Sequence, residues 1–120
     1  MRKVKVKICG LKRAQDIECV NRLLPDYIGF VFAKTKREVT EQQAAQLKAM
    51  LNPQIKAVGV FVNAEIDKII RLAKRTLDII QLHGDEDAAY CERLRLQTEL
   101  PIIKAVRVKD AGSFENLQAY

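Results

Sequence analysis

The amino-acid sequence predicts an α/β fold in which helices cover a parallel β-sheet. Apolar, β-branched runs typical of buried strands occur five times in the 120 residues. Amphipathic helical patterns with short connections lie between these runs. Strict alternation of strand and helix favours βαβ units, because adjacent parallel strands need a long crossover connection.

The five predicted strands have either alternating or continuous apolar character, and turn-forming or polar residues bound them. A continuous apolar run is typical of a strand that is buried on both faces of a parallel sheet. The strands are predicted over Val4–Cys9, Tyr27–Ala33, Ala57–Asn63, Asp78–His83 and Ile102–Val108.

The first two helices have clear helical periodicity. The first is predicted over Ala14–Leu24, where apolar residues recur on one face. The second is predicted to begin after Thr40, which can form a capping box with Gln43, and Pro53 follows as a stop.

The later helices are predicted from cap residues and charge. Asn63 is a candidate N-cap for the third helix, whose apolar residues begin at Ile66. The fourth helix is predicted to follow the acidic Asp85–Asp87, because acids favour a helix N-terminus. A fifth helix is predicted to begin at Ser113.

The spacing of the units leaves two architectures open. The predicted strands begin near residues 4, 27, 57, 78 and 102. A five-stranded flavodoxin-like sheet would be complete at this length, whereas a (β/α)₈ barrel needs eight units. The chain stops at Tyr120, inside a helical pattern and without a C-cap signal. We interpret it as five of eight barrel units, and a complete flavodoxin-like binding or signalling module without catalysis is the alternative.

The composition is that of a single soluble domain over residues 1–120. It is 48% hydrophobic and 30% charged, which excludes disordered and collagen-like chains. No apolar run approaches the roughly 20 residues of a membrane-spanning helix. The three cysteines, Cys9, Cys19 and Cys91, are widely spaced, which favours a reducing cytoplasm over a disulfide framework or a zinc site.

The charge is unevenly distributed, with +7 in residues 1–60 and −1 in residues 61–120. A solvated basic surface is the simplest interpretation, and a site for an anionic small molecule is the alternative. Nucleic acid is disfavoured as a partner, because aromatic residues are only 6% and Trp is absent. We therefore expect no nucleic-acid partner and no membrane partner.

Two segments at predicted strand ends carry candidate functional side chains. Cys9 ends the first strand, at the sheet edge where α/β sites are built, and Lys7 on the same face could favour its thiolate. The alternative is that Cys9 is a small buried hydrophobic residue. The loop after the second strand carries Lys34, Lys36 and Arg37, which could hold a carboxylate or phosphate or could simply be solvated.

The fourth predicted strand ends with polar residues. Gln81 precedes His83, the single histidine, which is either a ligand contact or a hydrogen-bonded structural residue. Cys19 lies off the apolar stripe of its predicted helix and Cys91 lies on one, and both are interpreted as structural. Phosphate-binding glycine loops are not evident in this sequence, which has five glycines.

Five short segments at the strand ends form one pattern across essentially the whole chain. They are Lys7-Ile8-Cys9-Gly10-Leu11, Gly29-Phe30-Val31-Phe32 with Lys36-Arg37, Val58-Gly59-Val60-Phe61-Val62-Asn63, Gln81-Leu82-His83-Gly84 and Lys104-Ala105-Val106. In this order and spacing they resemble the phosphoribosylanthranilate isomerase family of tryptophan biosynthesis. One such segment is unspecific, whereas five in register are not.

The resemblance implies a TIM-type (β/α)₈ barrel that binds a small phosphosugar–anthranilate substrate. The implied reaction is the Amadori rearrangement of N-(5-phosphoribosyl)anthranilate to 1-(carboxyphenylamino)-1-deoxyribulose 5-phosphate, with no cofactor and no metal. Cys9 matches the family's general base, which removes the C2 proton. Arg37 matches the arginine that contacts the anthranilate carboxylate, and Gln81 and His83 match residues that line the site.

The resemblance also assigns two parts of the family's site to elements beyond the fifth strand. The family's general acid follows its sixth strand, and its phosphate-binding loops follow the seventh and eighth. We therefore expect these 120 residues alone to be inactive. We also expect the open sheet either to self-associate or to pair with a complementing C-terminal half.

Overall fold

A computed structural model of the chain describes residues 4–109, 112, 117 and 120. Five strands alternate with four helices within these residues. No helix in this part of the chain has the length and apolar character needed to cross a membrane. The elements are β1 (Lys7–Cys9), α1 (Ala14–Leu23), β2 (Tyr27–Val31), α2 (Glu41–Met50), β3 (Lys56–Phe61), α3 (Ile66–Arg75), β4 (Ile79–Leu82), α4 (Ala88–Arg95) and β5 (Ile102–Lys104).

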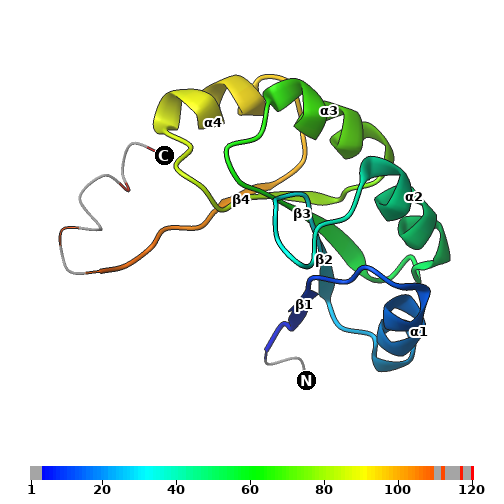
Figure 1. The fold of residues 1–120 in the computed structure, drawn as a ribbon. Helices are drawn as coiled ribbons and strands as arrows, with labels where there is room; N and C mark the ends of the chain where they lie inside the picture. The colour runs from blue at the N-terminus through cyan, green and yellow to red at the C-terminus, as the bar shows by residue number, and fades with distance from the viewer. Residues whose placement is uncertain (1–3, 110–111, 113–116, 118–119) are drawn as a thin grey trace.

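The strands form one parallel sheet in the order β1-β2-β3-β4-β5, so each strand pairs with the next one along the chain. Helices α1 to α4 follow one another along the outside of this sheet (Figure 1). A flavodoxin-like sheet has the order 2-1-3-4-5 and helices on both faces, so the strand order excludes that alternative. The order and the one-sided cover are those of a (β/α)₈ barrel. The sheet is open, and β1 and β5 are its edges among the described residues.

The hydrophobic core lies between the outer face of the sheet and the helices. Strand side chains alternate between the two faces, so every second strand residue points into this layer. Its fully buried members include Ile28 and Phe30 of β2, Phe61 of β3, and Ile80 and Leu82 of β4. The intervening residues therefore point to the inner face, where the candidate functional side chains lie.

The observed helices agree closely with the sequence pattern. Thr40 caps α2 as predicted: the Gln43 N–H donates to Thr40 Oγ1 at 3.0 Å, and the Thr40 N–H donates to Gln43 Oε1 at 2.8 Å. The predicted first helix is one residue too long, because Leu24 takes a left-handed conformation with φ 51°. Leu24 is 49% exposed and therefore lies outside the core.

The prediction that Asn63 caps the third helix is wrong, because Glu65 is the N-cap of α3 and Asn63 has a left-handed φ of 49°. Several predicted strands are too long, since a strand extends only as far as its partner. The first strand begins at Lys7 rather than Val4, and the fifth ends at Lys104 rather than Val108. The fifth helix, predicted from Ser113, falls mostly outside the described residues.

Candidate active site

The four residues that the sequence singled out line one cavity at the carboxyl ends of the strands. The cavity has a volume of about 480 Å³ and is lined by Cys9, Arg37, Gln81 and His83. Thr35 and the apolar Val60 are also among the residues that line it. This volume lies within the ordinary range of small-molecule sites, roughly 300–1,000 Å³. The topology therefore brings together residues that are as far apart in sequence as β1 and β4.

Cys9 is exposed at the end of β1 and lies opposite Gly29 of β2. A Cβ atom added to Gly29 would lie 2.7 Å from Cys9 Sγ and 3.3 Å from Lys7 Cε. Gly29 thus leaves the space that the Cys9 and Lys7 side chains occupy on the inner face. The thiol remains open to solvent and to a ligand.

Lys7 spans the inner face of the sheet. Its ammonium group donates a hydrogen bond to Gln81 Oε1 on β4, across the two intervening strands. An ammonium group can only donate, so it occupies the carbonyl end of the Gln81 amide. The Gln81 NH₂ group is then the end that can donate to another acceptor.

Arg37 lies against the turn that follows β1. Gly10 has φ 91°, and a Cβ atom added to it would lie 2.3 Å from Arg37 Cδ. A glycine at this position permits both the positive φ and the close approach of Arg37. The loop is held by a hydrogen bond of 2.8 Å from Lys12 Nζ to the Lys36 carbonyl oxygen.

Only two of the three loop cations line this cavity. Lys36 and Arg37 contribute to it, whereas Lys34 lines a separate hollow together with Lys68 and Arg71. The sequence pattern could not distinguish them, because the loop between β2 and α2 has no regular periodicity.

His83 is exposed directly after β4, and its backbone N–H donates to the Phe61 carbonyl oxygen at 2.8 Å. It also lines a second hollow of about 730 Å³, which extends to Lys104 and Tyr120. Thr35 and Val62 also line both hollows, so the two hollows adjoin each other at the carboxyl ends of the strands. His83 therefore stands at the junction of the two.

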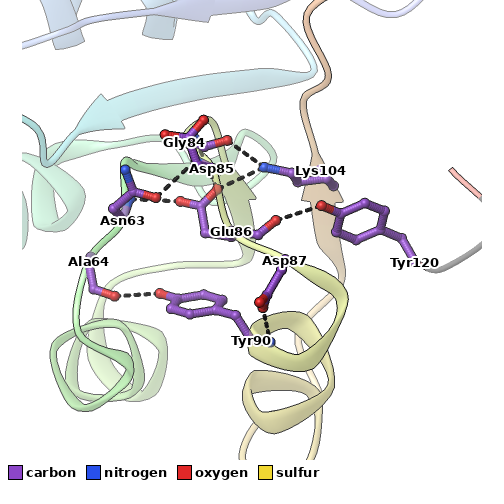
Figure 2. Close-up of polar contacts among 9 residues, drawn as sticks. All are labelled: Asn63, Ala64, Gly84, Asp85, Glu86, Asp87, Tyr90, Lys104 and Tyr120. Carbon is purple, nitrogen blue, oxygen red and sulfur yellow. Dashed lines mark hydrogen bonds and ion pairs between the residues drawn. The ribbon is translucent and has the colours of Figure 1, made fainter. Parts of the chain in front are cut away.

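Sequence reasoning missed the role of Glu86, which it read only as an acid at a helix start. The Glu86 carboxylate is buried and accepts hydrogen bonds from Asn63 N at 2.8 Å, Gly84 N at 2.9 Å and Lys104 Nζ at 2.8 Å (Figure 2). Burial by itself raises the pKa of Glu86, but the hydrogen bonds, led by that from Lys104, outweigh it and hold this pKa below its ordinary value. The local pattern contained no signal for this role, since it depends on Lys104 in a later strand.

The chemistry available in the cavity is that of proton transfer next to an anion-binding group. A thiol can accept a proton as the thiolate, and a guanidinium group can bind a carboxylate through two parallel hydrogen bonds. Among the described residues, no group of three or more His, Cys, Asp or Glu side chains is arranged to hold a metal ion.

Comparison with known sequences relates the chain to one family. The family model for N-(5'-phosphoribosyl)anthranilate isomerase matches residues 6–120. The isomerase of Endomicrobium trichonymphae is 50% identical over 107 residues, covering 88% of this chain and 54% of that protein. The isomerase of Thermoanaerobacter pseudethanolicus is 45% identical over 118 residues, covering 98% and 57%. The chain thus spans about half the length of the curated relatives it matches.

Solved structures agree with this relationship. The phosphoribosyl anthranilate isomerase of Thermotoga maritima superposes with a TM-score of 0.84 at 34% identity, covering 96% of this chain and 56% of that one. A phosphoribosyl anthranilate isomerase in complex with reduced 1-(o-carboxyphenylamino)-1-deoxyribulose 5-phosphate also gives 0.84 at 34% identity, covering 96% and 59%. The Thermus thermophilus enzyme gives 0.79 at 30% identity, covering 88% and 53%.

Proposed function

This chain belongs to the N-(5'-phosphoribosyl)anthranilate isomerase family, and from that premise we propose that the protein carrying it catalyses the Amadori rearrangement of N-(5-phosphoribosyl)anthranilate. The product is 1-(carboxyphenylamino)-1-deoxyribulose 5-phosphate, and the step belongs to tryptophan biosynthesis. The observation that carries the proposal is the convergence of Cys9, Arg37, Gln81 and His83 on one cavity.

Cys9 acts as the general base in this proposal. Once the ribose ring has opened to the iminium form, the Cys9 thiolate removes the proton from C2, and the electron pair moves toward C1 and the nitrogen. The resulting enolamine rearranges to the ketone, so hydrogen moves from C2 to C1 without net oxidation. No electron acceptor is therefore needed. The exposed position of Cys9 beside Gly29 supports this role, because a substrate carbon can approach the sulfur.

The other three residues bind the substrate. Arg37 contacts the anthranilate carboxylate, for which its planar pair of donors is suited. Gln81 offers its NH₂ group, because Lys7 occupies its carbonyl oxygen. His83 contacts the substrate from the junction of the two hollows. In the family the ring-opening acid and the phosphate loops follow later strands, so we expect the 120 residues alone to lack activity.

The experiment uses the protein expressed from the complete coding region that contains these residues, with product separated by chromatography. We expect turnover of N-(5-phosphoribosyl)anthranilate, and we expect Cys9→Ala to lower kcat by about 10²-fold or more, in the range for a lost acid–base group. Cys19→Ala is the matched control, because Cys19 is also an exposed thiol but lies on α1, away from the cavity. Absence of turnover contradicts the proposed reaction, and equal turnover by Cys9→Ala removes Cys9 from it.

We also place this activity in the cytoplasm. Three free cysteines, two of them exposed, are typical of a compartment that keeps thiols reduced. The open edges β1 and β5 support a further partner, which is either a second copy of this chain or a complementing C-terminal half.

A further inference from the structure

One backbone position beside the cavity is held by a buried ion pair. The Gly84 N–H donates to Glu86 Oε1 at 2.9 Å, and Lys104 Nζ donates to the Gly84 carbonyl oxygen at 2.6 Å (Figure 2). The two side chains also bind each other, with 2.8 Å between Lys104 Nζ and Glu86 Oε1. Both polar backbone atoms of Gly84 are therefore hydrogen-bonded to the Glu86–Lys104 pair.

The pair is more deeply buried than a surface salt bridge. The Lys104 and Glu86 side chains are 13% and 0% exposed. Burial of two charges carries a large desolvation penalty, so such a pair contributes little net stability compared with apolar residues of the same volume. What a fully hydrogen-bonded pair does provide is a fixed geometry. The loop around Gly84 is accordingly a place where geometry matters.

The pair also joins three successive strand ends. The second Glu86 oxygen accepts from the Asn63 N–H after β3, Gly84 follows β4, and Lys104 ends β5. The packing leaves no room at Gly84, where an added Cβ atom would lie 2.8 Å from Asn63 Oδ1 and 3.0 Å from Asn63 N. Figure 2 shows these groups gathered between the loops after β3 and β4 and the end of β5.

His83 directly precedes the fixed glycine. The backbone N–H of His83 donates a hydrogen bond to the Phe61 carbonyl oxygen, so the backbone is held on both sides of the His83 side chain. Glu86 itself is not among the residues that line either hollow, and Lys104 lines only the second one. Neither side chain therefore borders the cavity that contains Cys9, although both fix the peptide next to His83.

We propose that Glu86 and Lys104 are positioning residues that hold His83 in place at the cavity. The role of His83 toward the substrate rests on the proposed function. The positioning itself rests on the hydrogen bonds around Gly84.

The kinetic test compares two ion pairs in the protein from the complete coding region. Glu86→Gln and Lys104→Met break the Glu86–Lys104 pair. Lys48→Met breaks the Lys48–Asp78 pair, which joins α2 to the residue before β4 and lies at the amino ends of the strands, away from the cavity. We expect the first two variants to lower kcat/KM about tenfold or more, since a misplacement of about 1 Å can cost about 10²-fold. We expect Lys48→Met to leave kcat/KM unchanged. Equal effects of all three variants overturn the proposal.

A double-mutant cycle separates positioning from general stability. If Glu86 acts through His83, then Glu86→Gln has no further effect on kcat/KM in the His83→Ala background. The same factor in both backgrounds overturns the proposal, because the two residues would then act independently.

A spectroscopic test is independent of activity. His83 is the only histidine in the 120 residues, so its imidazole resonances are unique in an NMR spectrum of this chain. We expect Glu86→Gln to shift or split them and Lys48→Met to leave them unchanged. If Glu86→Gln does not fold, Lys104→Arg retains the charge but changes the geometry at Gly84, and it must shift the same resonances. Unchanged resonances overturn the positioning role even in a protein that is active. A protein without isomerase activity overturns the proposed function, while the NMR comparison still decides the positioning role.

Discussion

Gly10 and Gly29 do not line the cavity, but each leaves room for a side chain that does. Gly10 gives Arg37 space to lie against the turn after β1. Gly29 gives the Cys9 side chain space on the inner face of the sheet. A third glycine, Gly59, faces the opposite side of the sheet, where an added Cβ atom would lie 2.4 Å from Leu77 Cδ1 in the core. The same substitution in two strands should therefore have different consequences.

We expect Gly29→Ala to lower kcat with little loss of stability, because the new methyl group displaces an exposed thiol that can rotate toward solvent. We expect Gly59→Ala to lower the free energy of unfolding by about 1–3 kcal/mol through overpacking, with normal turnover per folded molecule. Steady-state kinetics and urea unfolding of both variants check this pair. Full turnover by Gly29→Ala would argue against a precise requirement for the Cys9 sulfur.

The strand pattern places Cys9, Gln81 and His83 at or next to the carboxyl end of a strand, whereas Arg37 lies further along the loop after β2 and was singled out by its charge and by the family resemblance. In a parallel sheet this position alone brings the first three to one edge. Glu86 could not be predicted, because its partner Lys104 is 18 residues away and only the folded chain brings them together. Local sequence predicts at which end of a strand a residue lies, but not which residues of other strands lie beside it.

At the scale of elements, the capping box of α2 offers a direct test. Thr40→Ala removes the acceptor for the Gln43 N–H and should lower the free energy of unfolding by about 1 kcal/mol, within the range of about 0.5–2 for lost caps. Glu65→Ala at the start of α3 is the control, because Glu65 is an N-cap whose side chain accepts no capping hydrogen bond. Urea unfolding measures both variants. A smaller loss for Thr40→Ala than for Glu65→Ala would contradict the assignment.

Element types could be predicted from periodicity, whereas several element ends could not. The predicted start of α2 is confirmed because it depends on a local motif, the capping box of Thr40 and Gln43. The start of α3 was wrong because the Asn63 Oδ1 atom accepts from the Asp85 N–H at 2.9 Å, a contact between two loops. Strand ends depend in the same way on the partner strand, which periodicity within one segment does not contain.

At the scale of the molecule, the two ends of the strands differ in character. The carboxyl ends of the strands border the cavity, whereas at the amino ends two aspartates accept hydrogen bonds from backbone groups in or next to the preceding strand. Asp26 Oδ2 accepts from the Val6 N–H at 2.7 Å, and Asp78 Oδ2 accepts from the Ala57 N–H at 2.8 Å. Barrels commonly separate function and stability between their two ends in this way.

Asp78 gives this separation a pH dependence. Burial by itself raises the pKa of Asp78, but the hydrogen bonds from the Ala57 N–H and Lys48 outweigh it and hold the pKa below its ordinary 3.8. A depressed pKa in the folded state adds stability that is fully present above the ordinary value and is lost as the pH falls through the folded one. We therefore expect Asp78→Asn to lower the free energy of unfolding at pH 7 and to flatten its decline below about pH 4.

Urea unfolding from pH 7 to about pH 2.5 measures this dependence, with Glu92→Gln on the exposed side of α4 as the control. A decline in acid that is as steep in Asp78→Asn as in the parent chain would contradict the role of Asp78.

The inner face of the sheet predicts self-association of the 120-residue chain. On this face Val62 and Ile103 are 43% and 45% exposed, whereas the outer face is covered by helices (Figure 1). Exposed apolar surface favours association by roughly 25 cal/mol per Å² buried. We expect light scattering to show a mass that rises with concentration and Ile103→Lys to reduce this rise. Leu96→Lys, at a site that is 83% exposed just after α4, should not reduce it. A compact monomer at high micromolar concentration would contradict the prediction.

The sequential strand order also sets the order in which the chain can assemble as the ribosome produces it. Each strand pairs with the strand synthesised just before it, so every new unit finds its docking surface already made. The bond between Lys7 and Gln81 is an exception, because it joins residues 74 positions apart and must wait until β4 has emerged. The layers of the core can therefore form progressively during translation, whereas the cavity is completed only after most of them are in place.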